Sequence, residues 1–396
     1  MDTSIGARIK HFRGRSMTQT QLADLAEVHP SLIRQLEQGK REGASIMSLH
    51  KISKALDVDI ADLVGKRHGI PSEDPGAGVV AIRHALNSVD DLIDDGPGQL
   101  PVTLHEARRA VDYAWGAYWN GRYETLTAVL PPGLSQLRAT AHAARRSEIA
   151  PAHELLARMY WVTGCTLVHL GQSDPAFAAI RSALTAAERG NDSLLAATLR
   201  GSVSWQLLVQ GRYEESHKVA LKAAASVEPV GEATEEQLAV YGSLVLQGAT
   251  AAGRQQRVQD ALDIVVAAQE VASRLPGDTK HYECNFGPSQ VVMQSVDVNV
   301  SSERYPEAIE AAKAMPDGGA GLAQVSRARH RLDQAAALAR TGQNQRALDM
   351  LLTAERIGGR DWVRYQTLLK QVVAELREKE RQHSALRSLA ERAGVR

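Results

Sequence analysis

The chain has 396 residues, of which 44% are hydrophobic and 23% are charged, and its 46 basic and 46 acidic side chains cancel to a net charge of zero. This composition excludes wholesale disorder and collagen-like sequence, and a neutral chain cannot coat nucleic acid through bulk charge, so any DNA contact must be local. No stretch approaches the roughly 18 apolar residues of a membrane helix, and the N-terminus has no apolar signal segment, so we expect no membrane partner. Because Cys165 and Cys284 are the only cysteines and lie far apart, we expect a cytoplasmic protein without a disulfide framework.

Charge and composition also divide the chain. Residues 1–68 hold 11 basic and 8 acidic side chains, whereas residues 69–100 hold one basic and six acidic side chains among several Gly and Pro residues. Ala and Leu, both strong helix formers, are abundant, and no convincing run of alternating β-branched residues occurs, so the fold class is predicted to be all-α. We expect a five-helix domain over 1–68, an acidic linker with a short helix (apolar spacing within 79–94) over 69–101, and a helical-repeat domain over 102–396.

The N-terminal segment carries the start and stop signals of two short helices. Thr18 is followed three positions later by Gln21, which is a capping-box pattern and predicts a helix over Gln19–Ala26. After a tight turn, a second helix is expected over Pro30–Gln38, since a proline at the first helical position loses no hydrogen bond. Two short helices joined in this way predict a helix-turn-helix.

The pattern T-Q-x-Q-L-A-x-L-A-x-V-x-x-S-x-I-x-x-L-E-x-G-K-R closely resembles the Cro/cI-type (XRE) DNA-binding domain, over residues 4–66. The resemblance implies binding to double-stranded DNA, with the second helix in the major groove, where Gln35 reads adenine and Arg34 reads guanine or binds phosphate. The DNA-binding residues that it implies are Thr18, Gln19, Pro30, Ser31, Arg34, Gln35, Lys40 and Arg41. Arg13 and Glu37 occupy the positions of the family's ion pair, and His29 replaces the usual Ser or Thr cap. The alternative is a helix-turn-helix that serves only protein contact.

Turn signatures recur every 38 to 51 residues through the rest of the chain, each between two helical segments. They are Gly121-Arg122-Tyr123, Gly171-Gln172, Gly211-Arg212-Tyr213, Gly253-Arg254, Glu303-Arg304-Tyr305 and Gly342-Gln343. Such a period predicts a solenoid of helical hairpins, closed by a capping helix pair over 367–395. The segment AWGAYWNGRYETLTAVL (114–130) resembles the tetratricopeptide repeat, and a generic helical array would have the same architecture.

The longest connection between repeats, PGDTKHYECNFG (276–287), has no helical period. Long loops in compact arrays are usually functional or disordered, and the aromatic residues here disfavour disorder, so we expect this loop to edge a concave ligand groove. The candidate ligand-binding residues are Trp205, Tyr241, Tyr282, Asn285, Gln290, Gln294, Arg327 and His330, of which the last two could meet an anionic group. The alternatives are that the loop packs on the outer surface, that the tryptophans are repeat core, and that the basic residues near His330 form a solvated face.

Nothing in the sequence indicates catalysis. Zinc-protease, serine-hydrolase, phosphate-loop and dinucleotide-binding motifs are all missing, so we expect no enzyme activity, no cofactor and no metal site. His281-x-x-Cys284 is half of a metal site with no second pair nearby, and a loop role is favoured.

The joined architecture resembles two groups, the Gram-positive peptide-pheromone regulators and the actinomycete XRE–repeat regulators, the latter through AWGAYWNGRY and the F-G-P-S element at 286–289. The resemblance implies a cytoplasmic, homodimeric, sequence-specific transcription regulator that reads a near-palindromic operator and senses a peptide or small-molecule effector with its repeats. The alternative is a DNA-binding regulator whose repeats are a protein-interaction scaffold without a small ligand. A groove lined by polar and aromatic side chains would favour the ligand.

Overall fold

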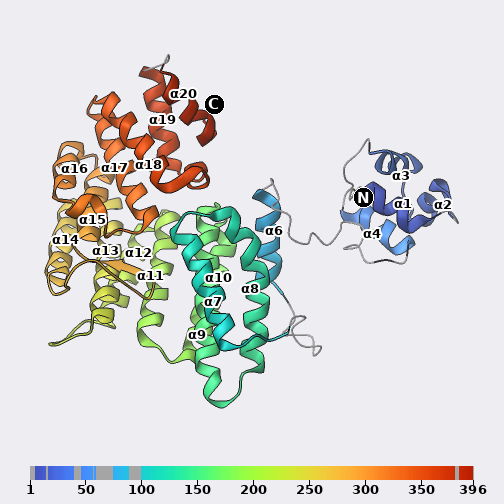
Figure 1. Cartoon of the computed structure of the whole chain (residues 1–396), viewed down its shortest axis with the longest axis horizontal. Coiled ribbons are helices and arrows are strands. Elements are labelled where there is room, and N and C mark those ends of the chain that lie inside the picture. Colours follow the sequence, from blue (N-terminus) through green and yellow to red (C-terminus); the bar gives the residue numbers. More distant parts are fainter. Residues whose placement is uncertain are drawn as a thin grey trace. The chain divides into compact units, whose positions relative to one another are not determined.

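A computed structural model describes residues 5–14, 17–39, 46–56, 58, 75–88, 100–379 and 383–395. The chain divides into two compact units, Met1–Pro71 and Ser72–Arg396, which are treated separately below. The described residues form helices and a single two-stranded antiparallel sheet (Figure 1), so the all-α prediction is confirmed. None of the helices in these ranges is long and apolar enough to cross a membrane.

The N-terminal unit packs four short helices around a small apolar core. These helices are α1 (Ile5–Arg13), α2 (Gln19–Leu25), α3 (Pro30–Glu37) and α4 (Ile46–Ala55). Their buried residues are Ile9, Leu22, Ala23, Ala26, Ile33, Leu36 and Ile52. The expected fifth helix lies outside the described residues, as do Lys40 and Arg41.

The second unit begins with α6 (Pro75–Leu86) and continues as seven helical hairpins stacked in chain order (Figure 1). The hairpin helices are α7 (Leu104–Trp119), α8 (Tyr123–Ala143), α9 (Ile149–His169), α10 (Ser173–Gly190), α11 (Ser193–Val209), α12 (Tyr213–Ala225), α13 (Glu235–Arg254), α14 (Val258–Ala272), α15 (Pro288–Ser301), α16 (Tyr305–Ala311), α17 (Gln324–Arg340), α18 (Asn344–Arg364), α19 (Thr367–Lys379) and α20 (Ser384–Ala393). Short 3-10 helices are η2 (Arg146–Glu148), η3 (Ala312–Ala314) and η4 (Pro316–Gly319). The predicted hairpin repeats and the terminal helix pair are thus present.

Helix α6 falls within the segment that the sequence analysis treats as a linker, and it packs against the first hairpin. Its Ile82 is fully buried, and Arg138 of α8 donates a hydrogen bond to the carbonyl oxygen of Ala85. The helix begins earlier than the apolar spacing predicts and ends at Leu86, and residues 89–99 lie outside the described ranges.

Most of the predicted turn signatures hold. Gly121, Gly171, Gly211 and Gly342 have φ between 67° and 78°, and Glu303 takes the same left-handed position at φ 60°. The fourth signature is wrong, because α13 continues through Gly253 and Arg254 and the left-handed residue is Gln256, at φ 62°. The left-handed conformation favours glycine without requiring it, so a search for glycine places this turn too early.

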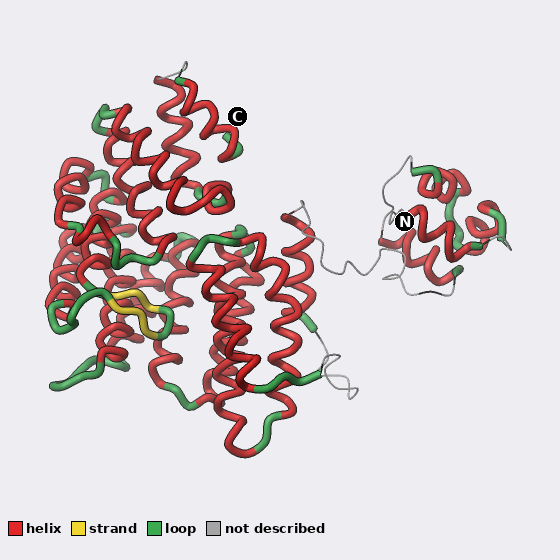
Figure 2. The backbone as a smooth tube through the Cα atoms, in the orientation of Figure 1, coloured by secondary structure: helices red, strands yellow, loops and turns green. Residues whose placement is uncertain are grey.

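The loop over 276–287 contains a β-hairpin that the sequence analysis does not predict. Strands β1 (Thr279–His281) and β2 (Cys284–Phe286) pair antiparallel, shown in yellow in Figure 2. Tyr282 and Glu283 form its two-residue turn with φ of 48° and 55°, the positive values that match the twist of paired strands. The hairpin is anchored at both sides: Phe286 is buried against α13, and the carboxylate of Asp278 accepts hydrogen bonds from the N–H (2.9 Å) and hydroxyl (2.6 Å) of Ser289.

The stack of hairpins curves until its sixth member meets its first. Gly359, at φ 84°, breaks α18, and the short segment after it reaches the turn between α7 and α8. There Asp361 accepts a 2.9 Å hydrogen bond from the backbone N–H of Glu124, and Arg364 pairs with the Glu124 carboxylate at 3.2 Å. These contacts join residues separated by more than half of the chain.

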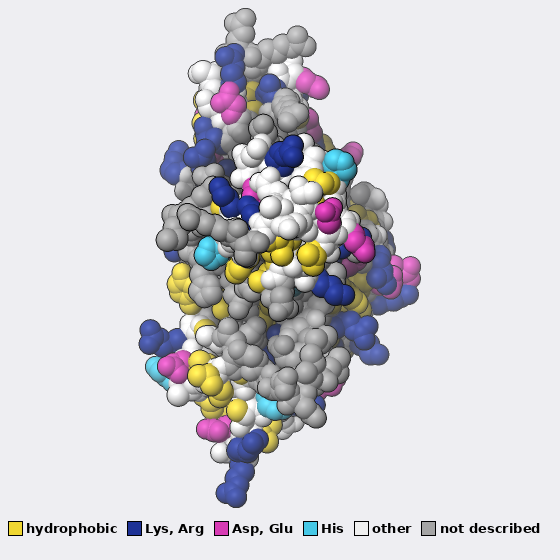
Figure 3. All heavy atoms as spheres, turned by 90° about the vertical axis from the view of Figure 1, so that its right-hand side faces the viewer, with side chains coloured by type: hydrophobic (Ala, Val, Ile, Leu, Met, Phe, Trp, Pro, Cys, Tyr) yellow, Lys and Arg dark blue, Asp and Glu magenta, His cyan; other side chains and the backbone are white. Residues whose placement is uncertain are grey.

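Charged side chains are dispersed over the face of the molecule that Figure 3 shows. On the face of the molecule in Figure 3, Lys and Arg side chains are interspersed with Asp, Glu and hydrophobic side chains. This pattern agrees with the zero net charge of the chain and with the inference that any DNA contact is local.

Two helical glycines provide a matched test of the packing under the β-hairpin. A Cβ at Gly242 would lie 2.0 Å from the ring of Phe286, whereas a Cβ at Gly116 meets nothing within 4 Å. We expect Gly242→Ala to lower the free energy of unfolding by about 1–3 kcal/mol, because Phe286 must move. Gly116→Ala should instead raise it by about 0.5–1 kcal/mol, as for alanine at an unobstructed helical position. Urea unfolding of the full chain followed by circular dichroism measures both. Equal stability of the wild type and Gly242→Ala would contradict this account of the hairpin anchor.

Candidate functional site

The helix-turn-helix is built by local capping. The Thr18 hydroxyl accepts a hydrogen bond from the N–H of Gln21 (3.1 Å), and the Gln21 side chain accepts one from the N–H of Thr18 (2.8 Å), which is the predicted capping box. At α3, His29 Nδ1 accepts a hydrogen bond from the N–H of Ser31 at 3.2 Å. An imidazole nitrogen therefore replaces the usual hydroxyl cap, and α3 starts at Pro30 as predicted.

One carboxylate fixes the first three helices to each other. Glu37 of α3 forms a two-point ion pair with Arg13 of α1, at 2.7 and 3.0 Å, and accepts a 2.8 Å hydrogen bond from the side-chain amide of Gln19 of α2. Burial raises the pKa of Glu37, but the hydrogen bonds from Arg13 and Gln19 outweigh it, and the pKa lies below its ordinary value. Glu37 is thus a structural residue of the motif, and the side chain of Gln19 is already partly engaged.

Helix α3 presents a polar face opposite its apolar one. Ile33 and Leu36 are buried, whereas Ser31, Arg34 and Gln35 are exposed. Pro30 is half-buried at the start of the helix, and Thr18 is exposed at the cap of α2. The predicted base-reading side chains are therefore together on one face of a helix that the core holds in place.

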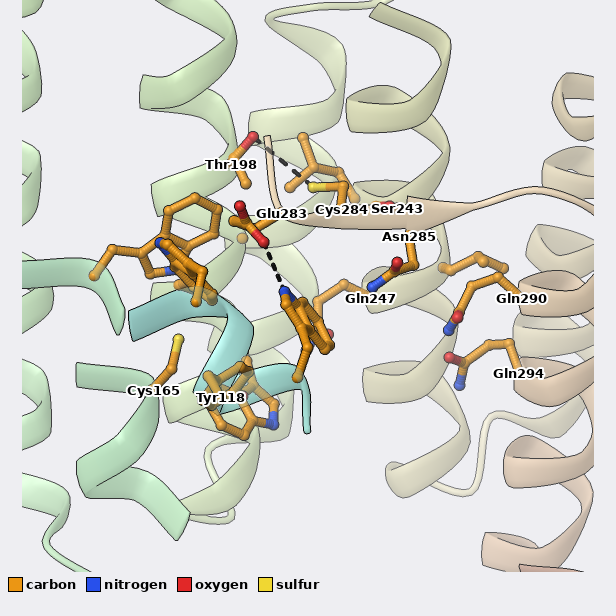
Figure 4. Close-up of a pocket in the computed structure, with 18 residues that line it drawn as sticks. Tyr118, Cys165, Thr198, Ser243, Gln247, Glu283, Cys284, Asn285, Gln290 and Gln294 are labelled. Atoms are coloured by element: carbon orange, nitrogen blue, oxygen red, sulfur yellow. Dashed lines mark hydrogen bonds between the residues drawn. The ribbon is translucent and has the colours of Figure 1, made fainter. Parts of the chain in front are cut away.

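The second unit contains a cavity of about 240 Å³ (Figure 4). Its walls come from the first helices of five consecutive hairpins and from the β-hairpin. An aromatic side of the lining consists of Trp115, Tyr118, Trp119, Trp161 and Trp205. A polar side consists of Thr198, Ser202, Ser243, Gln247, Gln290 and Gln294, with Asn285 from the hairpin.

The polar wall repeats with the hairpins. Ser202, Gln247 and Gln294 each lie nine residues before the left-handed turn residue of their own hairpin, which is Gly211, Gln256 or Glu303. A second row at the thirteenth residue before the same turns consists of Thr198, Ser243 and Gln290. Because four residues separate the two rows, both lie on the same face of each helix. The polar wall of the cavity therefore follows from the repetition of the helical hairpins.

The β-hairpin forms one wall of the cavity. The carboxylate of Glu283, in the hairpin turn, accepts a 2.6 Å hydrogen bond from the indole N–H of Trp119 and pairs with Lys280 at 2.6 Å. On the aromatic side, Trp115 and Trp161 pack edge to face at 4.7 Å, and the indole N–H of Trp161 donates to Ser202 at 2.6 Å. Figure 4 shows the hairpin residues on one side of the space and the glutamines on another.

Three side-chain polar atoms of the lining are buried without a hydrogen-bond partner. They are the indole nitrogen of Trp115, the hydroxyl oxygen of Ser243 and the amide nitrogen of Gln247. A buried polar group that forms no hydrogen bond costs about 1–3 kcal/mol, so native proteins seldom keep one without a reason. The nitrogen atoms of Trp115 and Gln247 are donors that face a cavity, where a bound molecule with acceptor groups can satisfy them.

Both cysteines of the chain also line this cavity. Burial raises the pKa of the Cys165 thiol to about 12 and that of Cys284 to about 11, so both are protonated at neutral pH and are poor nucleophiles. The structure places no group of three or more His, Cys, Asp or Glu that could hold a metal within the residues it describes. The two thiols are therefore suited to non-covalent contact with a bound molecule.

The structure separates the predicted ligand residues into two sets. Trp205, Asn285, Gln290 and Gln294 line the cavity. Four others do not: Tyr241, Tyr282, Arg327 and His330. Tyr282 is in the hairpin turn with the Arg158 guanidinium 5.3 Å from its ring centre.

His330 is fully buried, which contradicts the alternative of a solvated basic face at this residue. Its Nε2 lies 2.7 Å from the amide nitrogen of Gln334. Burial, with a smaller contribution from Arg331, lowers its pKa to about 4, so the imidazole is neutral at pH 7.

The sequence did not point to three further lining residues, Trp115, Gln247 and Glu283, and it favoured a repeat-core role for Trp119. Aligning the repeats on their left-handed residues would have found Gln247, which shares its position with Ser202 and Gln294. The position of Gln256 had first to be known for that alignment. No local signal places Glu283 beside Trp119.

These features define a class, a helix-turn-helix domain followed by a helical-repeat unit with a cavity. Residues 9–63 match the family described as Helix-turn-helix. The N-terminal unit therefore contains an XRE-type helix-turn-helix domain. No curated protein sequence matches the chain.

Among solved structures, PlcR of Bacillus thuringiensis in complex with the peptide PapR7 and DNA is 14% identical, with 78% of this chain and 95% of that chain covered and a TM-score of 0.39. A Rap protein complexed with competence and sporulation factor is 12% identical, with 74% and 93% covered and a TM-score of 0.43. The apo competence regulator ComR of Streptococcus vestibularis is 13% identical, with 85% and 98% covered and a TM-score of 0.30. With TM-scores this low, neither the ligands nor the partners of these proteins can be assigned to this chain.

The buried His330 predicts a pH dependence of stability. Its folded pKa of about 4 lies below the ordinary 6.5, so between these values the unfolded chain binds more protons and stability falls as the pH drops. The variant His330→Gln keeps an acceptor for Gln334 and does not titrate. We expect it to reduce the stability lost between pH 6.5 and 4 by up to about 3 kcal/mol, measured by urea unfolding across this range.

The matched control is His11→Gln, at an exposed histidine of α1, which should leave the pH dependence unchanged. Burial also lowers the pKa of His169 to about 4. The pH dependence of stability that His169 contributes should therefore persist in both variants. An unchanged pH profile in His330→Gln would show that His330 is charged in the folded protein.

Proposed function

We propose that the protein is a sequence-specific DNA-binding transcription regulator whose repeat unit binds a small effector in the cavity described above. The observation that carries the proposal is the pair of unpartnered buried donors, on Trp115 and Gln247, in a cavity of a chain that also has a helix-turn-helix. An interaction scaffold with no ligand needs neither an aromatic-lined cavity nor unsatisfied donors within it. A family of DNA-binding domains and a built cavity together favour effector-controlled regulation over constitutive binding.

The exposed face of α3 supports direct reading of bases. Gln35 has the side chain that pairs with adenine through two hydrogen bonds, and Arg34 has the one that pairs with guanine. Ser31 can contact either base, and Pro30 offers an apolar surface to a thymine methyl group. Thr18, and Gln19 through its second amide hydrogen, contact phosphate at the start of α2, where the helix dipole favours an anion. Lys40 and Arg41 complete this proposal as backbone contacts.

The proposed assembly is a homodimer on a near-palindromic operator. A single module of this size buries little DNA surface, and helix-turn-helix proteins gain affinity by placing two recognition helices about one helical turn of DNA apart. We assign dimerisation to the repeat unit. The protein acts in the cytoplasm, where DNA and an intracellular effector are both accessible.

Base reading by Gln35 is tested by substitution. We expect Gln35→Ala to weaken binding to the preferred operator by roughly 1–3 kcal/mol and to relax one base position in each half-site, since the paired hydrogen bonds to adenine are lost. Selection from random DNA followed by titration of wild type and variant measures both effects. Gln259→Ala, at an exposed glutamine of α14 in the repeat unit, is the matched control and should change neither. A selection that enriches no motif with the wild type would refute the proposed DNA function.

Effector binding is tested on protein purified from its own host. Native mass spectrometry should show a co-purifying mass, and Asn285→Ala and Gln294→Ala should each remove it, because both side chains line the cavity. The same variants should lose the effector's influence on DNA binding while binding DNA normally in its absence. Retention of the mass in both variants would place the ligand elsewhere, and the absence of any mass from the wild type would favour the scaffold.

A further inference from the structure

The lining of the cavity specifies what it can bind. Resting on the proposed function, we propose that the effector is a small uncharged molecule, with a ring and at least one carbonyl or hydroxyl acceptor, rather than an ion or a peptide. Four properties of the cavity carry this inference: its charge, its aromatic side, its amide side and its size.

The first property is the lack of a free charge. Glu283 is the one carboxylate among the lining residues, and it accepts a hydrogen bond from the Trp119 indole and pairs with Lys280. No Arg, Lys or His lines the space. An ionic ligand would lose its hydration without finding a counter-charge, which is strongly unfavourable.

Charges adjacent to the cavity are also balanced. Gln294 donates to Asp297 at 3.2 Å, and Asp297 pairs with Arg254 at 2.9 Å and with Arg329 at 3.3 Å. Arg329 in turn pairs with the buried Asp333 at 2.9 Å. Two cations and two anions thus neutralise each other behind Gln294, and this network offers no unpaired charge to a ligand.

The aromatic side selects a flat or ring-shaped body. Trp115 packs edge to face on Trp161 at 4.7 Å and lies nearly parallel to Trp119, with 25° between their planes. With Tyr118 and Trp205 these rings line a single side of the cavity, as in sites that hold a ring by face and edge contacts. Rings fixed by their own packing lose little freedom when a ligand binds.

The polar side selects hydrogen-bonding groups. The buried N–H of Trp115 and the amide nitrogen of Gln247 are donors without partners, so a complementary ligand must supply acceptor oxygens or nitrogens. Asn285 and Gln290 line the same space, and each side-chain amide provides both donors and an acceptor. A neutral carbonyl or hydroxyl compound satisfies this set, since every group on both sides is uncharged.

The size of the cavity favours a small molecule over an extended peptide. Its volume of about 240 Å³ lies just below the roughly 300–1,000 Å³ of typical small-molecule sites. A chain of several residues, at about 3.3–3.6 Å per extended residue, would extend beyond this space and leave most of its length outside the lining.

The test uses full-length protein and matched compounds that differ only in charge. Each set carries a carboxamide, a carboxylate or an ammonium group on one ring scaffold, for example 4-hydroxybenzamide, 4-hydroxybenzoate and 4-hydroxybenzylamine. Calorimetric titration should show the neutral members binding at least tenfold more tightly than either ion. Extended hexapeptides of mixed sequence should not compete for the site.

Substitutions of lining residues test whether this preference arises from binding in the cavity. Gln247→Leu and Trp115→Phe should each weaken the neutral compounds at least tenfold, whereas Gln259→Leu on α14 should not. Gln247→Glu should shift the preference toward the ammonium members, because it adds the only unpaired charge to the lining. Tighter binding of carboxylates, ammonium compounds or hexapeptides to wild type, or no binding by any set, would overturn the inference.

The outcomes also separate this inference from the proposed function. If neutral compounds bind through Gln247 but neither they nor any host-derived molecule changes DNA affinity, the ligand class stands and the regulatory role fails. If a charged molecule or a peptide recovered from the host binds in the cavity and releases DNA, the regulatory role stands and the ligand class fails.

Discussion

The hydrogen bond from the Trp119 indole to the Glu283 carboxylate joins the β-hairpin to the first helical hairpin and so completes one wall of the cavity. It links the first hairpin of the stack to the loop between the fourth and fifth, and Lys280 pairs with the same carboxylate oxygen from within the β-hairpin. A carboxylate that is paired with an ammonium group and also accepts a hydrogen bond attracts a further cation less strongly. The charge balance of the lining therefore depends on these contacts, as does the wall that the β-hairpin contributes.

Local signals made the N-terminal domain predictable. The capping box at Thr18 and the proline that starts α3 involve groups whose spacing is visible in the sequence. The ion pair between Arg13 and Glu37 was instead implied by the family resemblance, and it is present. His29 shows why a departure from a family pattern need not change the fold. The cap requires an acceptor at a certain place, and an imidazole nitrogen meets that requirement as a hydroxyl does.

The period of the helical repeats was predictable from the sequence, whereas the β-hairpin that forms a wall of the cavity was not. Helical spacing and turn residues indicate the hairpins, and four of the eight proposed ligand residues line the cavity. Two of these, Gln290 and Gln294, do so together because side chains four apart share a helix face. The β-hairpin has strands of three residues and a turn without Gly or Asn, so no propensity marks it. Arg327 and His330 have polar side chains as Gln290 does, but they lie 15 and 12 residues before the turn residue Gly342. They are therefore out of phase with the two lining rows, and neither lines the cavity.

The meeting of the first and sixth hairpins has a consequence for how such a chain can evolve. An open array of repeats can gain or lose a unit, since each repeat contacts only its neighbours. Here the bend at Gly359 places Asp361 on the backbone of Glu124, and that match requires a fixed number of units between them. Duplication of one hairpin would shift the partner by a whole unit. Lineages of this architecture should therefore diversify by substituting lining residues at a constant repeat number.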